Sequence, residues 1–228
     1  MNRPRGTKPL LFAFSILFSV GILLSADNAW EKQPEEWSLP EIKQVLEKSP
    51  WCRQSLIRHF GCSVSASREV RDAFTVRLVS ARPIRDAYAR LVQLSRPVDV
   101  SRSMEVSPDP KIFQPTQDRI VVAVSFRSDD LQRDLSLRQF FAKQQTSWMK
   151  WNAFLICGRS GRIEPVEYIR LNPETGEFRL IFPRSIKERA VVGDGDKELR
   201  FVLWVPPDQN LSVTWNLKAM RYRGALEY

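Results

Sequence analysis

Hydrophobic residues in the first half of the chain occur at helical and at strand spacing in turn. Positions 42, 45 and 46 are apolar at helical spacing, and Ser38 and Glu41 form a capping-box pattern before them. We therefore predict a short amphipathic helix that ends at Pro50. Residues 74–80 alternate between apolar and polar side chains, which predicts a strand. After Pro83, apolar side chains at positions 84, 87, 88, 91 and 92 predict a second amphipathic helix.

Strand patterns dominate the second half of the chain. Residues 120–126 are almost continuously apolar, which is typical of a strand buried on both faces. Residues 131–145 fit a helix, with Leu131, Leu135 and either Phe140 or Phe141 on its inward side. Beyond it we predict strands separated by turns, at residues 151–157, 163–171, 177–182, 198–205 and 211–220. The second of these contains Pro165, so we place it at a sheet edge.

This order of elements indicates an α+β fold, in which N-terminal helices and a strand–helix–strand unit precede an antiparallel β meander. A β-sandwich decorated with helices is the alternative. We predict one α+β domain over residues 38–228. Residues 95–117 contain four prolines and four serines, and they form a long loop that either lies within this domain or divides it. Residues 63–67 are small and polar and predict a short loop.

The N-terminus resembles an export signal. Arg3, Arg5 and Lys8 precede an uncharged apolar run at residues 10–24, and small residues follow it, so we predict a signal peptide over residues 1–26. The run is shorter than the roughly 20 residues of a membrane span, but the cleavage site is poor, which leaves an uncleaved N-terminal anchor as the alternative. We interpret residues 27–37 as a tether, with Trp30 and Trp37 suited to a membrane interface.

Both alternatives for the N-terminus place the rest of the chain outside the cytoplasm. The protein is then periplasmic or secreted, or it is tethered to the outer side of the cytoplasmic membrane. Membrane association would run through the N-terminus if the signal stays uncleaved.

Composition narrows the class of protein. The 228 residues include 35 Lys plus Arg and 26 Asp plus Glu, for a net charge of +9, with 43% hydrophobic and 11% aromatic residues. This apolar content excludes a disordered chain. Three cysteines are too few for a disulfide-dense scaffold. A single histidine removes most histidine-based catalysis and most zinc sites.

Several stretches resemble exported bacterial proteins that are themselves uncharacterised. They are residues 41–51 (EIKQVLEKSPW), 74–91 (FTVRLVSARPIRDAYARL), 182–184 (FPR), 217–220 (LKAM) and 224–226 (GAL). The resemblance implies an exported protein with a short N-terminal helix and a C-terminal strand meander. It implies no activity, no cofactor and no catalytic residue.

Cysteine and histidine positions leave three interpretations open. A disulfide between Cys52 and Cys62 is the simplest in an oxidising compartment, while two buried free thiols or a metal site that includes His59 are the alternatives. Cys157 ends an apolar strand, so we expect a buried, inert thiol there. We interpret His59 as a partly exposed residue at a helix end.

Carboxylate pairs are the candidates for hydrolytic chemistry, because two acids can share general acid and base roles. Local structure explains each pair without a catalytic role, as helix-start, strand or turn residues, and we favour that explanation. We expect Trp148 and Trp151 in core or sheet packing rather than in an aromatic platform for sugar or peptide. The three pairs are Asp129 with Asp130, Glu164 with Glu167, and Asp194 with Asp196.

Arginine is the most distinctive residue type. Arginine binds phosphate and carboxylate in a bidentate manner. A protein face rich in arginine therefore suits anionic lipid, lipopolysaccharide or an acidic protein. The export signal argues against nucleic acid. A solvated face with local ion pairs, such as Arg82 with Asp86, is the alternative. The candidate anion-binding or partner-binding residues are Arg68, Arg71, Arg77, Arg82, Arg85 and Arg90.

These observations favour an exported binding or structural module that is not catalytic and that needs neither cofactor nor metal. Its arginine-rich face is predicted to meet an anionic envelope component or an acidic partner. The alternative is a carboxylate-based extracytoplasmic hydrolase, which requires two acids from separate elements to converge in a cleft.

Overall fold

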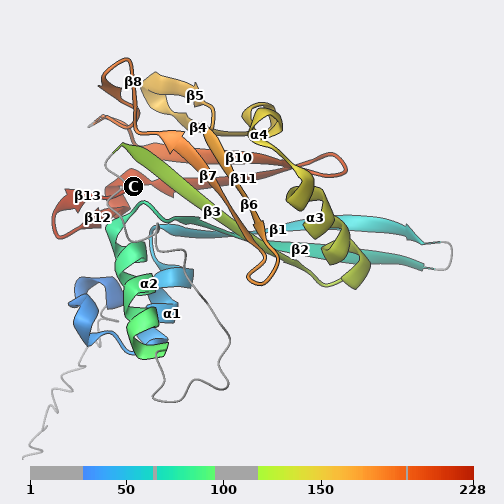
Figure 1. Ribbon diagram of the computed structural model, residues 1–228, viewed down its shortest axis with the longest axis horizontal. Helices are drawn as coiled ribbons and strands as arrows, with labels where there is room; N and C mark the ends of the chain where they lie inside the picture. The colour runs from blue at the N-terminus through green and yellow to red at the C-terminus, as the bar shows by residue number, and fades with distance from the viewer. Residues whose placement is uncertain (1–27, 64–65, 96–117, 194) are drawn as a thin grey trace, which may run out of the picture.

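The computed structural model describes residues 28–63, 66–95, 118–193 and 195–228, and it has the predicted α+β fold (Figure 1). Two antiparallel sheets make up most of the molecule, and two N-terminal helices lie side by side at one end of it. All strand pairs in the described residues are antiparallel, and hairpins join most strands of the C-terminal half, as the sequence predicts.

The larger sheet has five strands in the order β1-β2-β3-β7-β6. Its central strand β3 is buried on both faces, which confirms the expectation from its continuous apolar run. The register of β2 on β3 runs from Asp72 opposite Ser128 to Leu78 opposite Val122. The strands are β1 (Cys52–Ser63), β2 (Ala66–Leu78), β3 (Arg119–Ser128), β6 (Glu167–Asn172) and β7 (Glu177–Pro183).

The smaller sheet has four strands in the order β11-β10-β4-β5. They are β4 (Ala153–Cys157), β5 (Gly161–Ile163), β10 (Glu198–Val205) and β11 (Gln209–Asn216). The predicted strand at residues 163–171 is divided at Pro165 between β5 and β6, and each of these lies at the edge of its own sheet. Two short hairpins, β8 (Ser185–Ile186) with β9 (Arg189–Ala190) and β12 (Arg221–Tyr222) with β13 (Ala225–Leu226), complete the strands.

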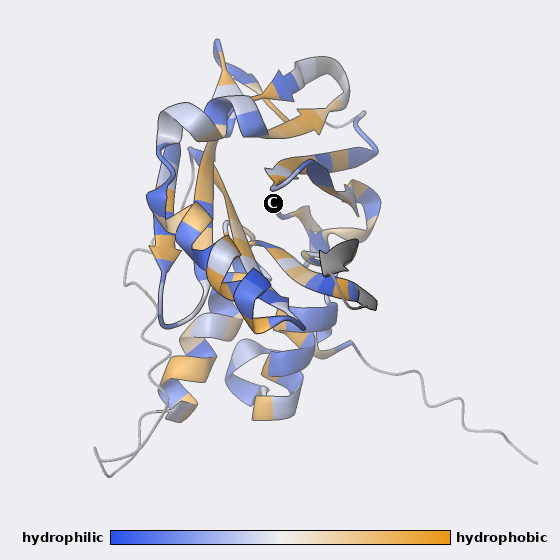
Figure 2. Cartoon of the chain, turned by 90° about the vertical axis from the view of Figure 1, so that its right-hand side faces the viewer, coloured by the Kyte–Doolittle hydropathy of each residue, from blue (hydrophilic) through white to orange (hydrophobic). Residues whose placement is uncertain are grey.

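The hydrophobic core lies between the inner faces of the two sheets. Phe182 of β7 meets Phe201 of β10 edge-on, with ring centroids 6.4 Å apart. Helix α3 (Leu131–Lys143) stacks Phe141 on Phe178 of β7 at 4.7 Å. Helix α4 (Thr146–Asn152) contacts strands of both sheets. Hydrophobic and hydrophilic residues alternate along the strands (Figure 2), and the buried residues form one continuous core.

The N-terminal helices are α1 (Leu39–Lys48) and α2 (Arg82–Ser95). The predicted capping box is present, because the Ser38 side chain accepts from the Glu41 backbone N–H and the Glu41 carboxylate accepts from the Ser38 backbone N–H at 2.9 Å. Helix α1 packs on α2 and on β1. Figure 1 shows the pair at the lower left, below the sheets.

Residues 28–37 do not form the predicted tether. They make two short 3-10 turns, η1 (Ala29–Glu31) and η2 (Pro34–Glu36), and Ala29 and Trp37 are fully buried in the core. Trp30 packs edge-on against Trp51 at 6.3 Å. Apolar side chains spaced among the acids of this segment are what anchor it to the body.

Two details of the α3–α4 region differ from the predictions. Leu131 and Leu135 are exposed, because the register that buries Leu137 and Phe141 turns both of them outward. The predicted strand at 151–157 begins only at Ala153, and Trp151 lies in the last turn of α4 with 78% of its surface exposed. Trp148 does pack, against Phe140 and Trp204.

No helix among the residues described is long and apolar enough to cross a membrane. The predicted signal or anchor at 1–26 and most of the loop at 95–117 fall outside those residues.

Candidate functional site

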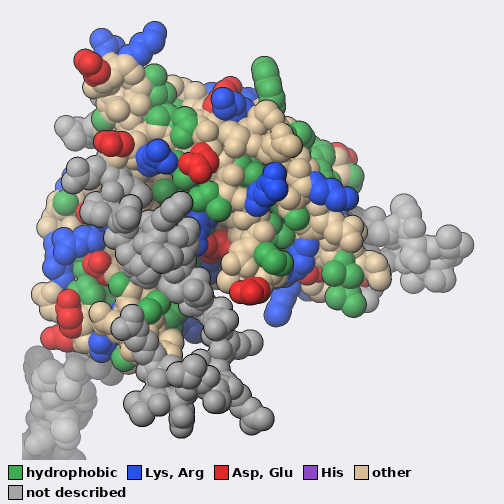
Figure 3. All heavy atoms as spheres, in the orientation of Figure 1, with side chains coloured by type: hydrophobic (Ala, Val, Ile, Leu, Met, Phe, Trp, Pro, Cys, Tyr) green, Lys and Arg blue, Asp and Glu red, His purple; other side chains and the backbone are tan. Residues whose placement is uncertain are grey.

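The candidate arginines do not share one face. Arg82, Arg85 and Arg90 lie on α2, Arg77 lies in the buried part of β2, and Arg71 lies near the far end of that strand. The side chain of Arg68, also on β2, falls outside the described part. On the face drawn in Figure 3, the described Lys and Arg side chains are scattered among acidic ones rather than gathered into a patch.

Arg77 belongs to a buried polar cluster between α1, α2 and the larger sheet. Its Nε donates to the Leu46 carbonyl of α1 at 2.8 Å, and its Nη1 lies 3.6 Å from the Glu177 carboxylate of β7. Burial raises the pKa of the neighbouring Tyr88 hydroxyl, and the charge of Glu177 raises it further. Tyr88 therefore stays protonated, and Arg77 joins helix to sheet rather than facing a ligand.

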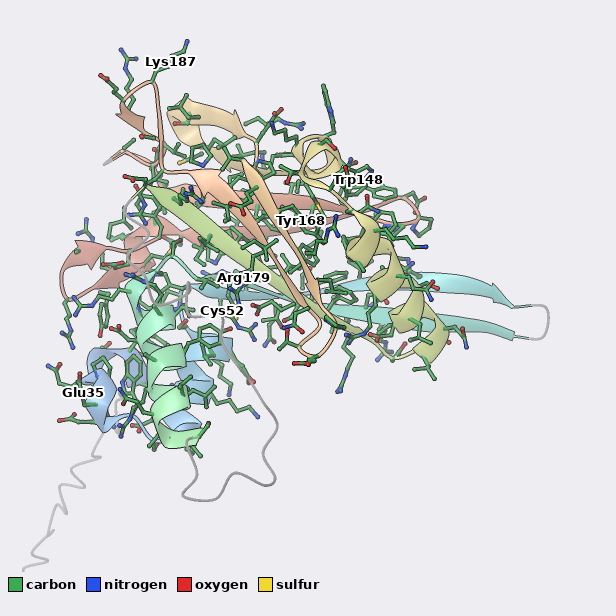
Figure 4. All side chains as sticks on the ribbon, viewed as in Figure 1. Glu35, Cys52, Trp148, Tyr168, Arg179 and Lys187 are labelled. Atoms are coloured by element: carbon green, nitrogen blue, oxygen red, sulfur yellow. The ribbon has the colours of Figure 1, made fainter. Side chains whose placement is uncertain are left out.

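A polar pocket beside α2 brings together two of the candidate arginines and one that the sequence did not suggest. The pocket has a volume of about 150 Å³. Figure 4 labels Glu35, which stands on its η2 side at the lower left. We call it the α2 pocket; it is lined by Gln33, Pro34, Glu35, Arg82, Asp86, Ala89, Arg90, Gln93 and Arg223.

Each guanidinium of the α2 pocket is oriented by one or two neighbours and keeps further N–H groups. Arg82 Nε lies 3.4 Å from the Asp86 carboxylate, one helical turn away. Arg90 Nε donates to the Trp37 carbonyl at 3.3 Å and its Nη1 to Gln93 at 3.2 Å. Arg223 Nη2 donates to the Gln33 side chain at 2.5 Å.

The charges of the α2 pocket sum to a small positive excess, with three arginines against Glu35 and Asp86. Burial raises the pKa of Asp86, against the opposing pull of Arg82 and Arg85. Partial desolvation of this kind strengthens any charge–charge interaction within the pocket.

Arg223 reaches the α2 pocket because of tertiary structure alone. It occupies the β12–β13 turn with a left-handed φ of 51°, next to Gly224. The start of α2 is fixed to the same region, since the Arg82 backbone N–H donates to the Glu227 carboxylate at 3.1 Å. No sequence motif links these two segments, so periodicity and spacing did not identify Arg223.

The predicted Cys52–Cys62 disulfide is wrong. Both residues lie on the same continuous strand β1, so their Cα atoms are about 30 Å apart, far beyond the roughly 7 Å limit of a disulfide. Cys52 is a free, buried thiol, and burial raises its pKa. Figure 4 labels it on β1. The expected oxidising compartment suggested the pairing, but residues 52–63 are a single extended strand of a hairpin, which keeps the two cysteines apart.

His59 is also on β1 and not at a helix end, and it takes part in a buried ionic cluster. Its Nε2 lies 2.9 Å from Oδ2 of Asp72, whose side chain is completely buried. Arg133 of α3 donates from Nε to the same oxygen at 2.9 Å, and its Nη2 donates to the Pro206 carbonyl between β10 and β11. Because Nε2 must carry the proton that it donates to Asp72, it cannot also accept from Arg133 Nη2, 3.3 Å away.

This His59–Asp72–Arg133 cluster joins β1, β2, α3 and the β10–β11 turn. The sequence does hold a signal for it, because Asp72 shares the inward parity of Phe74, Val76 and Leu78 along β2. A charged residue on a buried strand face requires partners, but only the fold shows which ones.

The acid pairs considered for hydrolysis are held by local contacts. Asp130 caps α3 by accepting from the Arg133 N–H at 2.8 Å, as its helix-start position predicts, and Asp129 accepts from the Arg71 N–H at 2.9 Å. Glu164 and Glu167 pair with separate arginines, Arg162 and Arg119. Asp196 accepts from the Gly193 N–H, and Asp194 lies outside the described residues.

Across the ranges that the structure covers, no group of three His, Cys, Asp or Glu residues is placed to hold a metal ion. Comparison with protein families, curated proteins and solved structures found no match. The functional argument therefore rests on the geometry and charge of this chain.

Proposed function

We propose that this protein is an exported, non-catalytic binding module and that the α2 pocket takes a small anionic group. The observation that carries the proposal is the convergence of Arg82, Arg90 and Arg223 from two distant segments on one concave site. The ligand group is a phosphate or carboxylate, presented by an anionic envelope component or by an acidic protein. Export is supported by the basic and apolar pattern of residues 1–26.

The size and donors of the α2 pocket both suit one small oxyanion. Its volume of about 150 Å³ is well below the roughly 300–1,000 Å³ of pockets that enclose drug-sized ligands. Guanidinium groups present paired donors that match two oxygens of a phosphate or carboxylate. Asp86 and Glu35 limit the net attraction, which favours a singly charged group at the end of a larger ligand.

The hydrolase alternative draws less support from this site. Glu35 and Asp86 both line the α2 pocket, but Asp86 is already engaged by Arg82 at 3.4 Å. A salt bridge of this kind explains the acid without a catalytic role. We therefore keep binding as the proposed function.

Anion binding can be tested with an Arg82→Gln and Arg223→Gln double variant. Arg90 is retained, because its Nε holds the Trp37 carbonyl. We expect affinity for inorganic phosphate and for phosphatidylglycerol vesicles to fall about tenfold or more, since each lost charge-assisted hydrogen bond contributes about 1.5–3 kcal/mol. Calorimetric titration at fixed low salt measures the first ligand and vesicle sedimentation the second.

The matched control is Arg170→Gln, which removes an exposed arginine outside the α2 pocket. It should bind as the unchanged protein does, and all three proteins should melt at similar temperatures. Equal affinity of the double variant and the control for both probes would contradict the proposal.

A further inference from the structure

A long hairpin extends beyond the sheets at the opposite end of the molecule from α2 (Figure 1). The pairing of β2 with β3 stops at Asp72 opposite Ser128. The pairing of β1 with β2 continues for six more residue pairs, from Arg58 opposite Arg71 to Ser63 opposite Ala66. At about 3.3 Å per residue, this two-stranded ribbon projects roughly 20 Å. We call residues 58–63 and 66–71 the arm.

Beyond Arg71, whose backbone N–H and C=O both bond to Asp129, the arm has two unpaired edges. Within the described ranges, no third strand joins its ladder on either side. A two-stranded ribbon is marginally stable alone in water, and its unpaired N–H and C=O groups form a template for another strand. Pairing with an added strand would satisfy these groups and stabilise the ribbon.

The root of the arm is fixed to the body by buried and paired contacts. His59 and Arg133 both meet the buried Asp72 carboxylate at 2.9 Å. The backbones of Arg71 and Asp129 are also joined, since Arg71 N–H donates to the Asp129 side chain at 2.9 Å and Asp129 N–H donates to the Arg71 carbonyl at 3.0 Å. The base of the arm is therefore fixed to the body, which lowers the entropic cost of binding a partner there.

The charge on the arm indicates the chemistry of that partner. Arg58 and Arg71 are opposite each other across the ribbon, so they share a face, and their side chains are 65% and 54% exposed. A single carboxylate, Glu69, serves both, at 3.3 Å from Arg58 and 3.4 Å from Arg71. Arg68 adds a further positive charge in the sequence. One acid cannot neutralise this set, so the complementary strand is acidic.

We infer that the arm is a docking site for an extended, acidic segment of another protein, which adds to the ribbon as a third strand. This site is separate from the α2 pocket and goes beyond the function proposed for it. A second copy of the chain is a poor occupant, because two arms would bring like charges together. Carboxylates alternating with β-branched residues would place the acids on the face of Arg58 and Arg71 and give the segment strand propensity.

The test uses the full chain and a synthetic peptide of alternating Glu and Val. We expect the peptide to bind and to slow hydrogen exchange of backbone amides in the arm. An Arg58→Gln and Arg71→Gln variant should bind about tenfold more weakly, because two charge-assisted contacts are lost. Glu69→Gln should bind more tightly, since it frees both guanidinium groups; this gain cannot arise from misfolding.

Two controls make the test specific. A peptide of alternating Lys and Val should neither bind nor protect the arm, and Arg170→Gln should behave as the unchanged protein. The α2 pocket variant should keep full peptide binding, so failure of either proposal leaves the other standing.

Four results would overturn the inference. They are absence of peptide-dependent protection in the arm, equal protection by the Lys–Val peptide, protection that rises with protein concentration alone, and protection by phosphatidylglycerol vesicles in place of the peptide. The third would indicate a second copy, and the fourth a lipid surface.

Discussion

Single arginines serve opposite purposes in this protein. Arg77 and Arg133 are largely buried, and their guanidinium groups donate hydrogen bonds to carbonyls and carboxylates of other elements. Arg58, Arg71 and Arg82 remain more than half exposed; Arg58 and Arg71 share Glu69, and Arg82 pairs with Asp86. Residue type and spacing identified the candidate arginines. They did not show which of these arginines are buried and which are exposed, because burial of each guanidinium depends on which element packs over it.

The capping box of α1 is the residue-scale feature that the sequence predicted fully, since its partners are three positions apart. The Lys32 ammonium at 2.7 Å and the hydrogen bonds from Ser38 lower the pKa of Glu41 from 4.5 to about 2.

We expect Glu41→Gln to reduce the free energy of unfolding by about 0.5 kcal/mol at neutral pH. A depressed carboxyl pKa contributes stability above the unfolded value, and this is lost as pH falls towards the folded one. The difference between the two proteins should therefore be constant above about pH 5 and shrink towards pH 2. Urea titrations across this range measure it, and a difference that grows on acidification would contradict the account.

Elements with a clear periodicity were predicted well. Strand β3, helices α1 and α2 and the C-terminal hairpins follow from apolar spacing and turn residues. In helix α3 the expected burial of Phe141 is confirmed, but Leu131 and Leu135 were wrongly placed inward, because the helix start is set by the Asp130 cap and its rotation by the contact of Phe141 with Phe178. Strand β7, on which α3 packs, lies far from the helix in the sequence. The packing that decides the rotation of α3 could therefore not be deduced from the sequence.

The His59–Asp72–Arg133 cluster should be a strongly coupled unit between elements. Arg133→Met is expected to cost about 3–5 kcal/mol of unfolding free energy, because it leaves the Asp72 carboxylate buried with less compensation. Asp72→Asn combined with Arg133→Met should cost less than the sum of the two single changes, since neither charge is then left without the other. Urea denaturation at neutral pH measures all three variants.

Arg138→Met is the matched control on the same helix. Arg138 pairs with Asp134 at 2.7 Å one turn away, in a more exposed setting, so its loss should cost under about 1 kcal/mol. Similar costs for Arg133→Met and Arg138→Met, or simple additivity in the double variant, would show that the cluster is not coupled.

At the scale of the whole molecule, the fold class was predictable and the domain limit was not. The order of helices and strands indicates α+β, whereas the distribution of strands over two sheets depends on pairings such as β4 with β10. The segment at 28–37 looked like a tether because it is largely polar and follows the predicted signal. Trp37 nevertheless lies within the core, so the folded body begins before α1.

Trp37→Ala should therefore cost about 3–5 kcal/mol of unfolding free energy, as expected for an aromatic side chain removed from a core. Trp151→Ala is the control, since that side chain is 78% exposed, and it should change stability by less than about 0.5 kcal/mol. Thermal and urea unfolding compare the two. Equal and small changes in unfolding free energy for the two variants would indicate that residues 28–37 are a tether and not part of the folded body.

The contact between Trp51 and the end of the chain has a consequence for the timing of folding. Trp51 Nε1 donates to the Glu227 carbonyl at 2.8 Å across 176 residues, and Arg53 reaches the Thr214 carbonyl across 161. Contacts this distant in sequence form slowly, and here they require nearly the whole chain to have been synthesised. A nascent chain that cannot close its core early remains unfolded, which is the state that the export we propose would require.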